Sequence, residues 1–409
     1  MMTETDILTL ITNGENSQTE FKEQFERNHP ERIAREIVGF ANMHGGYILV
    51  GVSDFKDIVG IQNENTQSWL MDTVIMRYVH PTIIPEYDEV TIDERTIAVI
   101  KVHMGVSKPY AVRHNNREDV YIRVGDTCQL ASREQIQRLF ESGGMLFMEK
   151  LPIPGSSIEE LDERKLRQYF LEILEYDENV WHENIQNILL DHSFLNSPDG
   201  TDSIFCSYFA CALFAYSPRL RLPQSGIRLM VFDGEEMDYN AKMDEILNLP
   251  FIGLGENGDS NHSDYSLPDH VMKYLQPHIS RDIVDASQHM QRKRHWDYAP
   301  DAIRELIINA FAHRDWTRQD MVWVVVYDNR MEVKSPGSLP NGMTIKKVIA
   351  GERAPRNTKI SDILRDYGFI EARGMGIRRK VIPLTLKKNG KEPLFEATED
   401  YFKVTLLKD

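Results

Sequence analysis

The chain has 409 residues, of which 41% are hydrophobic and 27% are charged, so it is globular and long enough for two or three hydrophobic cores. No apolar run is long enough to cross a bilayer and the N-terminus is acidic, so we expect a cytoplasmic protein without a membrane partner. The net charge of -16 excludes indiscriminate coating of nucleic acid, because phosphate contacts need clustered Lys and Arg side chains.

The first part of the chain, residues 1–150, is predicted to be a compact α/β domain. Apolar residues at helical spacing predict a helix over 33–41, and the glycine pair at 45–46 ends it. Short apolar strands are expected at 47–52, 96–104 and 119–125.

Two junctions divide the rest of the chain. A run of Pro, Gly and Ser at 151–157 is typical of a linker, and a basic cluster followed by a proline at 291–300 marks the second junction. We therefore expect a middle domain of mixed helices and strands over 151–295 and a third domain over 296–409. The fold class is α+β and multidomain.

The third domain opens with the segment RELIINAFAHRDW, which predicts a helix that is apolar nearly all the way round. Glu305 and Asn309 lie one turn apart on the same face of this helix. A carboxylate in apolar surroundings needs a cation, a donor or water, so one interpretation is a buried network with Arg304 or His313. The other is a phosphate site, in which Asn309 binds Mg²⁺ and Glu305 orients a water molecule. The pair alone leaves both interpretations open.

Later elements favour the phosphate site. An apolar strand over 322–327 and a turn at 328–329 predict a hairpin, and the last residues read as a closing strand. Two glycine groups follow, PGSLP at 336–340 and GMGI at 374–377. Glycine amides of this kind can approach a phosphate closely.

In this order the helix and the glycine groups resemble the Bergerat-type α/β sandwich that gyrase, heat-shock chaperones, histidine kinases and MutL share. More narrowly, residues 295–409 resemble the C-terminal region of RecG-like ATP-dependent helicases. The resemblance implies that Glu305 polarises the attacking water, that Asn309 holds Mg²⁺ and that the glycines of the two groups line ATP. These glycines are Gly337, Gly374 and Gly376.

One position departs from the superfamily pattern. Where the superfamily has an aspartate that reads the adenine amino group, this chain has Ser335, a neutral and shorter acceptor. We therefore expect ATP to bind, and leave open whether the chain hydrolyses it. A GxxxxGK[ST] phosphate loop is missing from the sequence, so we do not expect an autonomous helicase.

Residues 10–140 resemble the Schlafen-type AlbA-like domain of many bacterial regulators, through ENSQTEFKEQF, GFANMHGGYILVGVSD and SKPYAVRHNNREDVYIRVGDT. The resemblance implies binding of DNA or RNA, for which Lys22 and Arg123 are the candidates in this domain. A basic stretch at 373–391 adds Arg378 and Arg379. The alternative for that stretch is a solvated surface or a lid that contacts the nucleotide.

Some Schlafen proteins cleave RNA with three acidic residues, and the matching positions here are Glu15, Glu20 and Asp54. Three converging carboxylates would suit a metal-dependent ribonuclease, which could act in defence against phage. The alternative is that Glu20 pairs with Lys22 or a neighbouring arginine. Our main prediction is an ATP-binding, homo-oligomeric regulator in which nucleotide modulates nucleic-acid binding, with ribonuclease and silent scaffold as alternatives.

Overall fold

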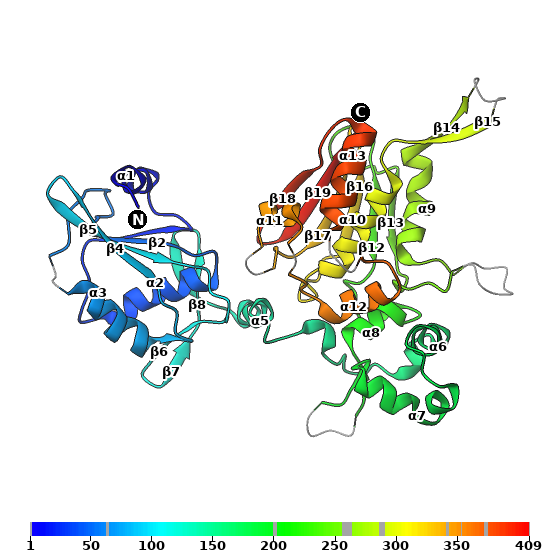
Figure 1. The fold of residues 1–409 in the computed structure, drawn as a ribbon, viewed down its shortest axis with the longest axis horizontal. Coiled ribbons are helices and arrows are strands. Elements are labelled where there is room, and N and C mark those ends of the chain that lie inside the picture. The colour runs from blue at the N-terminus through cyan, green and yellow to red at the C-terminus, as the bar shows by residue number, and fades with distance from the viewer. Residues whose placement is uncertain are drawn as a thin grey trace. The chain divides into compact units, whose positions relative to one another are not determined.

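The computed structural model describes residues 2–62, 65–198, 203–255, 264–285, 291–340, 343–352, 354–371 and 375–408, without the side chains of 283–285 and 291–293. The chain forms two compact units, Met1–Leu146 (unit 1) and Phe147–Asp409 (unit 2), drawn in Figure 1. Both units mix helices and strands, which confirms the predicted α+β class.

Unit 1 is built on a sheet with the strand order β1-β2-β5-β4. The β1/β2 pair is parallel and the other two pairs are antiparallel. The predicted strands at 47–52 and 96–104 correspond to β2 and β5. The strands are Thr19–Lys22 (β1), Gly46–Val50 (β2), Glu86–Ile92 (β4) and Arg95–Val102 (β5).

Both faces of this sheet are covered. Alternate strand residues such as Ile48 and Ile100 face the amphipathic helix α2 (Pro30–Asn42), the helix expected near 33–41. Their neighbours Leu49 and Val99 pack with the helix α1 (Glu4–Asn13) on the other face. The remaining elements of unit 1 are α3 (Thr66–Trp69), η1 (Leu70–Ile75), α4 (Met76–Tyr78), β3 (Val79–His80), β6 (Ala111–His114), β7 (Arg117–Asp119), β8 (Tyr121–Val124), β9 (Thr127–Leu130) and α5 (Arg133–Ser142).

Unit 2 is built on a sheet with the strand order β13-β12-β16-β17-β19-β18, in which only the β12/β16 pair is parallel. Strands β12 and β13 come from the predicted middle domain, whereas β16 to β19 come from the predicted third domain. A boundary at residue 295 would therefore cut one hydrogen-bonded sheet, and the two parts form a single unit. The strands are Ile227–Val231 (β12), Met243–Leu247 (β13), Val322–Val326 (β16), Arg330–Pro336 (β17), Leu394–Ala397 (β18) and Tyr401–Leu407 (β19).

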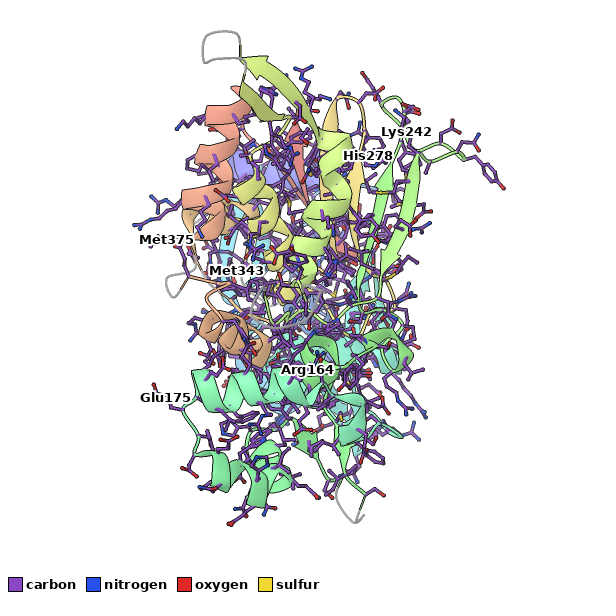
Figure 2. All side chains as sticks on the ribbon, turned by 90° about the vertical axis from the view of Figure 1, so that its right-hand side faces the viewer. Arg164, Glu175, Lys242, His278, Met343 and Met375 are labelled. Carbon is purple, nitrogen blue, oxygen red and sulfur yellow. The ribbon has the colours of Figure 1, made fainter. Side chains whose placement is uncertain are left out.

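The helices α9 (Leu267–Ile279) and α10 (Pro300–His313) pack on the face of this sheet to which Leu229, Val324 and Val333 point. Figure 2 draws the side chains that lie on and between these elements. The further elements of unit 2 are η2 (Met148–Lys150), η3 (Ile158–Glu160), α6 (Glu163–Arg167), η4 (Gln168–Ile173), α7 (Glu178–Asp191), β10 (Leu195–Asn196), β11 (Phe205–Cys206), α8 (Tyr208–Phe214), η5 (Pro218–Leu220), β14 (Ser280–Asp285), β15 (Gln291–Trp296), α11 (Ile345–Ala350), α12 (Thr358–Asp366), η6 (Ile377–Val381) and α13 (Ile382–Asn389).

The helix α10 begins four residues before the segment RELIINAFAHRDW and ends within it, at His313. Pro300 occupies its first turn, where a missing N–H costs nothing, and Asp301 places a negative charge at the positive end of the helix dipole. Arg314 leaves the helical conformation with ψ 150°. Its fully buried guanidinium donates to the backbone carbonyls of Gln224, Arg318 and Asp320. Tertiary contacts of this side chain therefore set the end of the helix.

Candidate functional site

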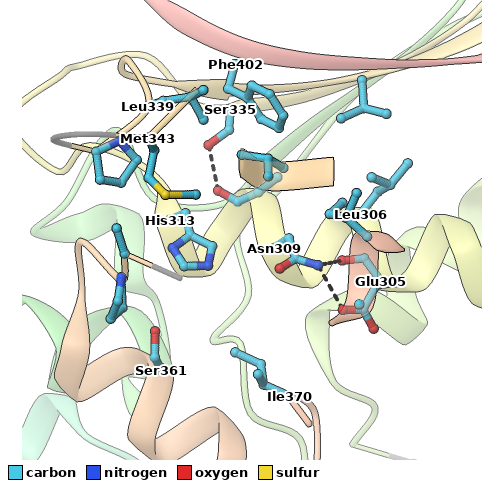
Figure 3. Close-up of a pocket in the computed structure, with 18 of the residues that line it drawn as sticks. Glu305, Leu306, Asn309, His313, Ser335, Leu339, Met343, Ser361, Ile370 and Phe402 are labelled. Atoms are coloured by element: carbon cyan, nitrogen blue, oxygen red, sulfur yellow. Dashed lines mark hydrogen bonds between the residues drawn. The ribbon is translucent and has the colours of Figure 1, made fainter. Parts of the chain in front are cut away.

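A pocket of about 190 Å³ lies between α10, the end of β17 and the segments around α11, α12 and η6. Figure 3 shows its interior. Of the residues predicted for nucleotide binding, Glu305, Asn309, Ser335, Gly337 and Gly376 all line this one pocket, although they lie on three separate segments. Gly374 lies outside the described residues.

Glu305 and Asn309 form a bonded pair in the pocket wall. The Asn309 amide nitrogen donates to Glu305 Oε1 at 2.9 Å and to the Glu305 backbone carbonyl at 2.7 Å. Figure 3 shows the amide nitrogen turned towards Glu305 and the amide oxygen turned away from it. The side chain of Glu305 is only 9% exposed, so a carboxylate here needs these donors. The amide oxygen of Asn309 is left as a ligand for a cation.

The second oxygen of Glu305 faces a cation from the C-terminal segment. Lys380 Nζ lies 3.6 Å from Glu305 Oε2 and 2.9 Å from Glu371 Oε1. The hydrogen bond to Glu371 raises the pKa of Lys380, and the charge of Glu305 adds to this effect. Both oxygens of the candidate water-orienting carboxylate are thus engaged. The cation that faces Glu305 is Lys380, whereas Arg304, one of the two network partners predicted from the sequence, pairs with Asp269 instead.

Gly376 is required by its contact with Glu305. Its backbone is helical, with φ −55° and ψ −48°, so any residue could adopt the conformation. A Cβ at this position, however, would lie 1.8 Å from Glu305 Oε1 and 2.5 Å from Glu305 Cδ. Only glycine lets the η6 segment approach the carboxylate this closely.

Ser335 sits at the end of β17, and its hydroxyl donates to the Ala310 backbone carbonyl at 2.7 Å. Because the hydroxyl proton is used inside the protein, the oxygen is left to the pocket as an acceptor. The adenine amino group is a donor. The serine therefore offers the same hydrogen-bonding sense as the aspartate of the superfamily, without its charge.

Gly337 follows at the turn out of β17. Its φ of 103° favours glycine, and a Cβ would lie 2.4 Å from Asp315 Cβ and 2.5 Å from Arg356 Nη1. Burial alone would raise the pKa of Asp315, yet this pKa is lowered, because Arg356 and Thr317 stabilise the charged carboxylate. The turn at Gly337 therefore packs directly against the buried, negatively charged Asp315.

Sequence reasoning missed the residues that fasten the pocket's rim. Arg356 donates to the Ser338 backbone carbonyl at 2.8 Å. Asn357, which is 1% exposed, donates to the carbonyls of Ala312 and Arg314 at the end of α10. The signal was present in RNTKISDILRD, where two polar residues directly precede the amphipathic helix α12.

Apolar side chains line much of the pocket. They provide apolar surface of the kind that covers a planar base. These side chains are Leu306, Leu339, Met343, Val348, Ile370 and Phe402.

In unit 1, Arg123 is buried rather than presented at the surface. It is 2% exposed, pairs with Glu20 at 2.8 Å and Glu36 at 3.0 Å, and lies 4.5 Å from the centre of the Phe40 ring. The prediction that Arg123 contacts nucleic acid is therefore wrong, because its guanidinium fastens β8 to β1 and α2. Lys22 is half-buried and bonded to Glu20.

Three carboxylates of unit 1, those of Glu15, Glu20 and Glu36, lie near two cations, Lys22 and Arg123. Burial raises the pKa of Glu36 to about 7, and the charge of Glu20 adds to the rise, against Lys22 and Arg123. Burial also raises the pKa of Glu15, which accepts a hydrogen bond from the Phe21 amide at 2.8 Å. Protonation of Glu36 therefore lowers the repulsion between the carboxylates of this cluster.

Of the three carboxylates predicted for a metal site, Glu20 and Asp54 lie close enough to Glu15 for their charges to raise its pKa further. Glu20 is engaged by Lys22 and Arg123, and Asp54 is exposed. In the described ranges, no group of three or more His, Cys, Asp or Glu side chains could hold a metal ion. The ribonuclease alternative stays a prediction.

Arg378 and Arg379 are exposed on η6, beside the pocket. Arg378 donates to the Ala350 carbonyl at 3.0 Å. They are placed where either a nucleotide's phosphates or a nucleic acid could meet them. Among the helices that the structure describes, none combines the length and apolarity needed to span a membrane.

Two family models match the chain. Residues 15–132 match the model described as "Schlafen, AlbA_2", and residues 320–406 match the model described as "Putative ATP-dependent DNA helicase recG C-terminal". The chain carries both of these domains. Both resemblances predicted from the sequence are thereby confirmed. Glu305 and Asn309 precede the second match, so their assignment depends on the pocket that α10 shares with the RecG-like C-terminal domain.

Individual relatives are distant. The uncharacterized ATP-binding protein UU034 of Ureaplasma parvum serovar 3 is 36% identical over 59 residues, which is 14% of this chain and 17% of that protein. The crystal structure of the DIP2311 protein from Corynebacterium diphtheriae aligns with 100% of this chain and 76% of its own, at 18% identity and a TM-score of 0.44. The N-terminal domain of a RecG-related protein from Nitrosomonas europaea aligns with 32% of this chain and 95% of its own, at 20% identity and a TM-score of 0.25.

Proposed function

We propose that the chain is an ATP-binding regulator in which nucleotide in the pocket of unit 2 modulates the binding of DNA or RNA by the AlbA_2 domain. The observation that carries this proposal is the convergence of Glu305, Asn309, Ser335, Gly337 and Gly376 on one pocket. Together with the apolar side chains that line the same pocket, these residues supply the apolar, acceptor and backbone-amide character that adenine and phosphate require.

Within this proposal the base lies among the apolar side chains, with the Ser335 oxygen accepting from the adenine amino group. The phosphates lie towards Gly376 and η6, where Lys380, Arg378 and Arg379 supply positive charge. A bound phosphate could replace Glu305 as an ion-pair partner of Lys380. Glu305 Oε2 would then no longer be engaged by Lys380.

Magnesium fits the same site through Asn309. Its amide oxygen points away from the internal hydrogen bonds, and Mg²⁺ is commonly held by one or two protein oxygens together with phosphate oxygens. When bound, the ion would neutralise charge that develops on the phosphates. The hydrogen bond from Asn309 fixes the position of the Glu305 carboxylate, and Glu305 would orient a water molecule. Hydrolysis is expected to be slow while Lys380 occupies Glu305 Oε2.

Coupling to unit 1 has a structural route along the backbone. Glu149 comes three residues after the division between the units, and its side chain is fully buried. Its carboxylate accepts from the Lys359 amide at 2.8 Å and the Ile360 amide at 2.9 Å, at the start of α12. The same helix contributes Ser361 and Arg365 to the pocket. A shift of α12 on nucleotide binding would therefore act directly on the segment that leaves the AlbA_2 domain.

Calorimetric titration of the intact chain with ATP and Mg²⁺, followed by phosphate release, tests the nucleotide half of the proposal. Glu305→Gln should keep binding and lose release, whereas Asn309→Ala should lose the Mg²⁺-dependent part of the affinity. Glu183→Gln, an exposed position on α7, is the matched control. No heat on titration of the unaltered chain would contradict the proposal.

Fluorescence anisotropy with a labelled DNA duplex and a labelled RNA, with and without ATP, tests the regulatory half. Coupling free energies of about 1–3 kcal/mol are usual, which correspond to a change in affinity of about 5- to 150-fold. We also propose that the chain is a homo-oligomer, which light scattering with and without ATP would measure. An unchanged nucleic-acid affinity at saturating ATP would refute the coupling while leaving ATP binding intact.

A further inference from the structure

The face of the unit 2 sheet opposite α10 carries a row of alternating cations and aromatic rings. The row crosses four adjacent strands: Arg228 on β12, Trp323 on β16, Lys334 on β17, and Tyr401 on β19. On β19, Lys403 is the direct register partner of Lys334, and Tyr401 lies two residues away on the same face. Arg228 is directly paired with Trp323, and Trp323 with Lys334, in the strand register.

The members of the row contact one another. Arg228 Cζ lies 5.6 Å from the centre of the Trp323 ring, and Lys334 Nζ lies 4.8 Å from it on the next strand. Lys334 Nζ is also 4.6 Å from the centre of the Tyr401 ring, so it bridges the two aromatics. Such contacts hold the rings and the ammonium in fixed places on the sheet. The row is therefore ordered before any ligand arrives.

This face is separate from the nucleotide pocket. Val333 and Ser335, the neighbours of Lys334 along β17, line the pocket. Because successive strand residues point to opposite faces, Lys334 belongs to the other side of the sheet. A substitution of Lys334 can therefore test this face without touching a residue of the pocket.

The charge on the row is positive once the ion pairs are counted. Arg228 pairs with Asp244, and Lys403 pairs with Glu396. Within the described part of the chain Lys334 makes no ion pair; it contacts two rings, and its charge helps to lower the pKa of Glu396. An ammonium held between two half-buried aromatic rings is thus available to an anion, in a chain whose net charge is -16.

Little apolar surface is left on this face for a protein partner to cover. The central apolar residues Met230, Val325 and Phe232 are 4%, 2% and 6% exposed, because their neighbours already cover them. Protein interfaces usually have an apolar core, whereas single-stranded nucleic acid is bound by aromatic rings and interleaved cations, and Trp323 and Tyr401 are partly exposed. Four strands at about 4.8 Å spacing span about 14 Å, which suits the two or three bases that an open sheet can stack.

We propose that this face is a binding surface for single-stranded nucleic acid, with bases stacking against Trp323 and Tyr401 and a backbone phosphate contacting Lys334. The surface is additional to the AlbA_2 domain. It gives unit 2 its own contact with a single strand, on the side of the sheet away from the nucleotide.

The test uses the intact chain and a fluorescein-labelled oligothymidylate of twelve nucleotides, with a labelled duplex as second probe. Lys334→Gln should weaken binding of the single strand about 5- to 10-fold. It should also make the plot of log affinity against log salt shallower by about 0.7, the value for one phosphate of a single strand. Binding should quench tryptophan fluorescence, and Trp323→Leu should remove that quenching. Lys346→Gln, an exposed lysine on α11 with the same change of charge, should bind as the unaltered chain does.

Two results would overturn the proposal: no binding of the oligothymidylate at low salt, or unaltered binding by Lys334→Gln. If Trp323→Leu does not fold, Lys334→Gln decides alone. A loss of self-association in Lys334→Gln, without any effect on the oligothymidylate, would also overturn it and assign the face to a second copy. Failure here is distinguishable from failure of the proposed function, because ATP heat and duplex binding are measured on the same variants and involve other residues.

Discussion

The contact between Gly376 and Glu305 makes a specific prediction about the nucleotide pocket. In Gly376→Ala the new methyl group would lie 1.8 Å from Glu305 Oε1, whereas ordinary contact begins at 3.4 Å. The carboxylate must therefore move by about 1.6 Å, which is enough to break its 2.9 Å hydrogen bond with Asn309. Overpacking of this kind costs about 1–3 kcal/mol. The backbone at Gly376 is helical, so strain in φ does not contribute.

A double-mutant cycle isolates the cause. In the Glu305→Ala background the obstacle is gone, and Gly376→Ala should be neutral or stabilising by about 0.5–1 kcal/mol, since Ala is the better helix former. Calorimetry of the intact chain measures the effect: each kcal/mol corresponds to about 2–4 °C in the unfolding midpoint of a domain this size. ATP affinity should fall in the single variant, because Asn309 loses the partner that orients it. If Gly376→Ala costs the same in both backgrounds, the close approach of η6 to the carboxylate is refuted.

Three other predictions concern buried charges. The pKa of Glu36 is about 7 in the folded AlbA_2 domain, against an ordinary value of 4.5. Between these pH values the folded state binds a proton that the unfolded state does not, so the domain should lose stability as pH rises from 4.5 to 7. Glu36→Gln should flatten that profile in calorimetry, and an unchanged slope would contradict the assignment. Glu149→Gln should cost about 1–3 kcal/mol of unfolding free energy in urea, because an NH2 group replaces one of the two oxygens that accept the backbone N–H bonds. The control Glu163→Gln, at an exposed position, should cost almost nothing. Arg314→Met should lower the free energy of unfolding by more than about 3 kcal/mol, since three backbone carbonyls lose their donor. An unfolding midpoint close to that of the unaltered chain would contradict this prediction and show that the carbonyls find other donors.

Local spacing was enough to place the helix α10 and the relation between Glu305 and Asn309. Two residues four apart on a helix must share a face, because the helical repeat is 3.6 residues, and the structure has them hydrogen-bonded. The two domains were likewise identifiable from short motifs in chain order. The sequence could not show which group binds the hydroxyl hydrogen of Ser335. In the structure the hydroxyl donates to the Ala310 carbonyl, and this leaves the oxygen as an acceptor.

Contacts between distant segments decided the rest. A sequence cannot show which basic residues are desolvated, so Arg123 was predicted to be a surface cation, although four acceptor groups hold it in the interior. The pairing of β12 with β16 joined two predicted domains into one sheet, because strand partners are chosen by packing and not by proximity along the chain. Lys380 reaches Glu305 across 75 positions of sequence. Motif and periodicity thus determined which residues could act, whereas long-range packing and desolvation determined which of them meet.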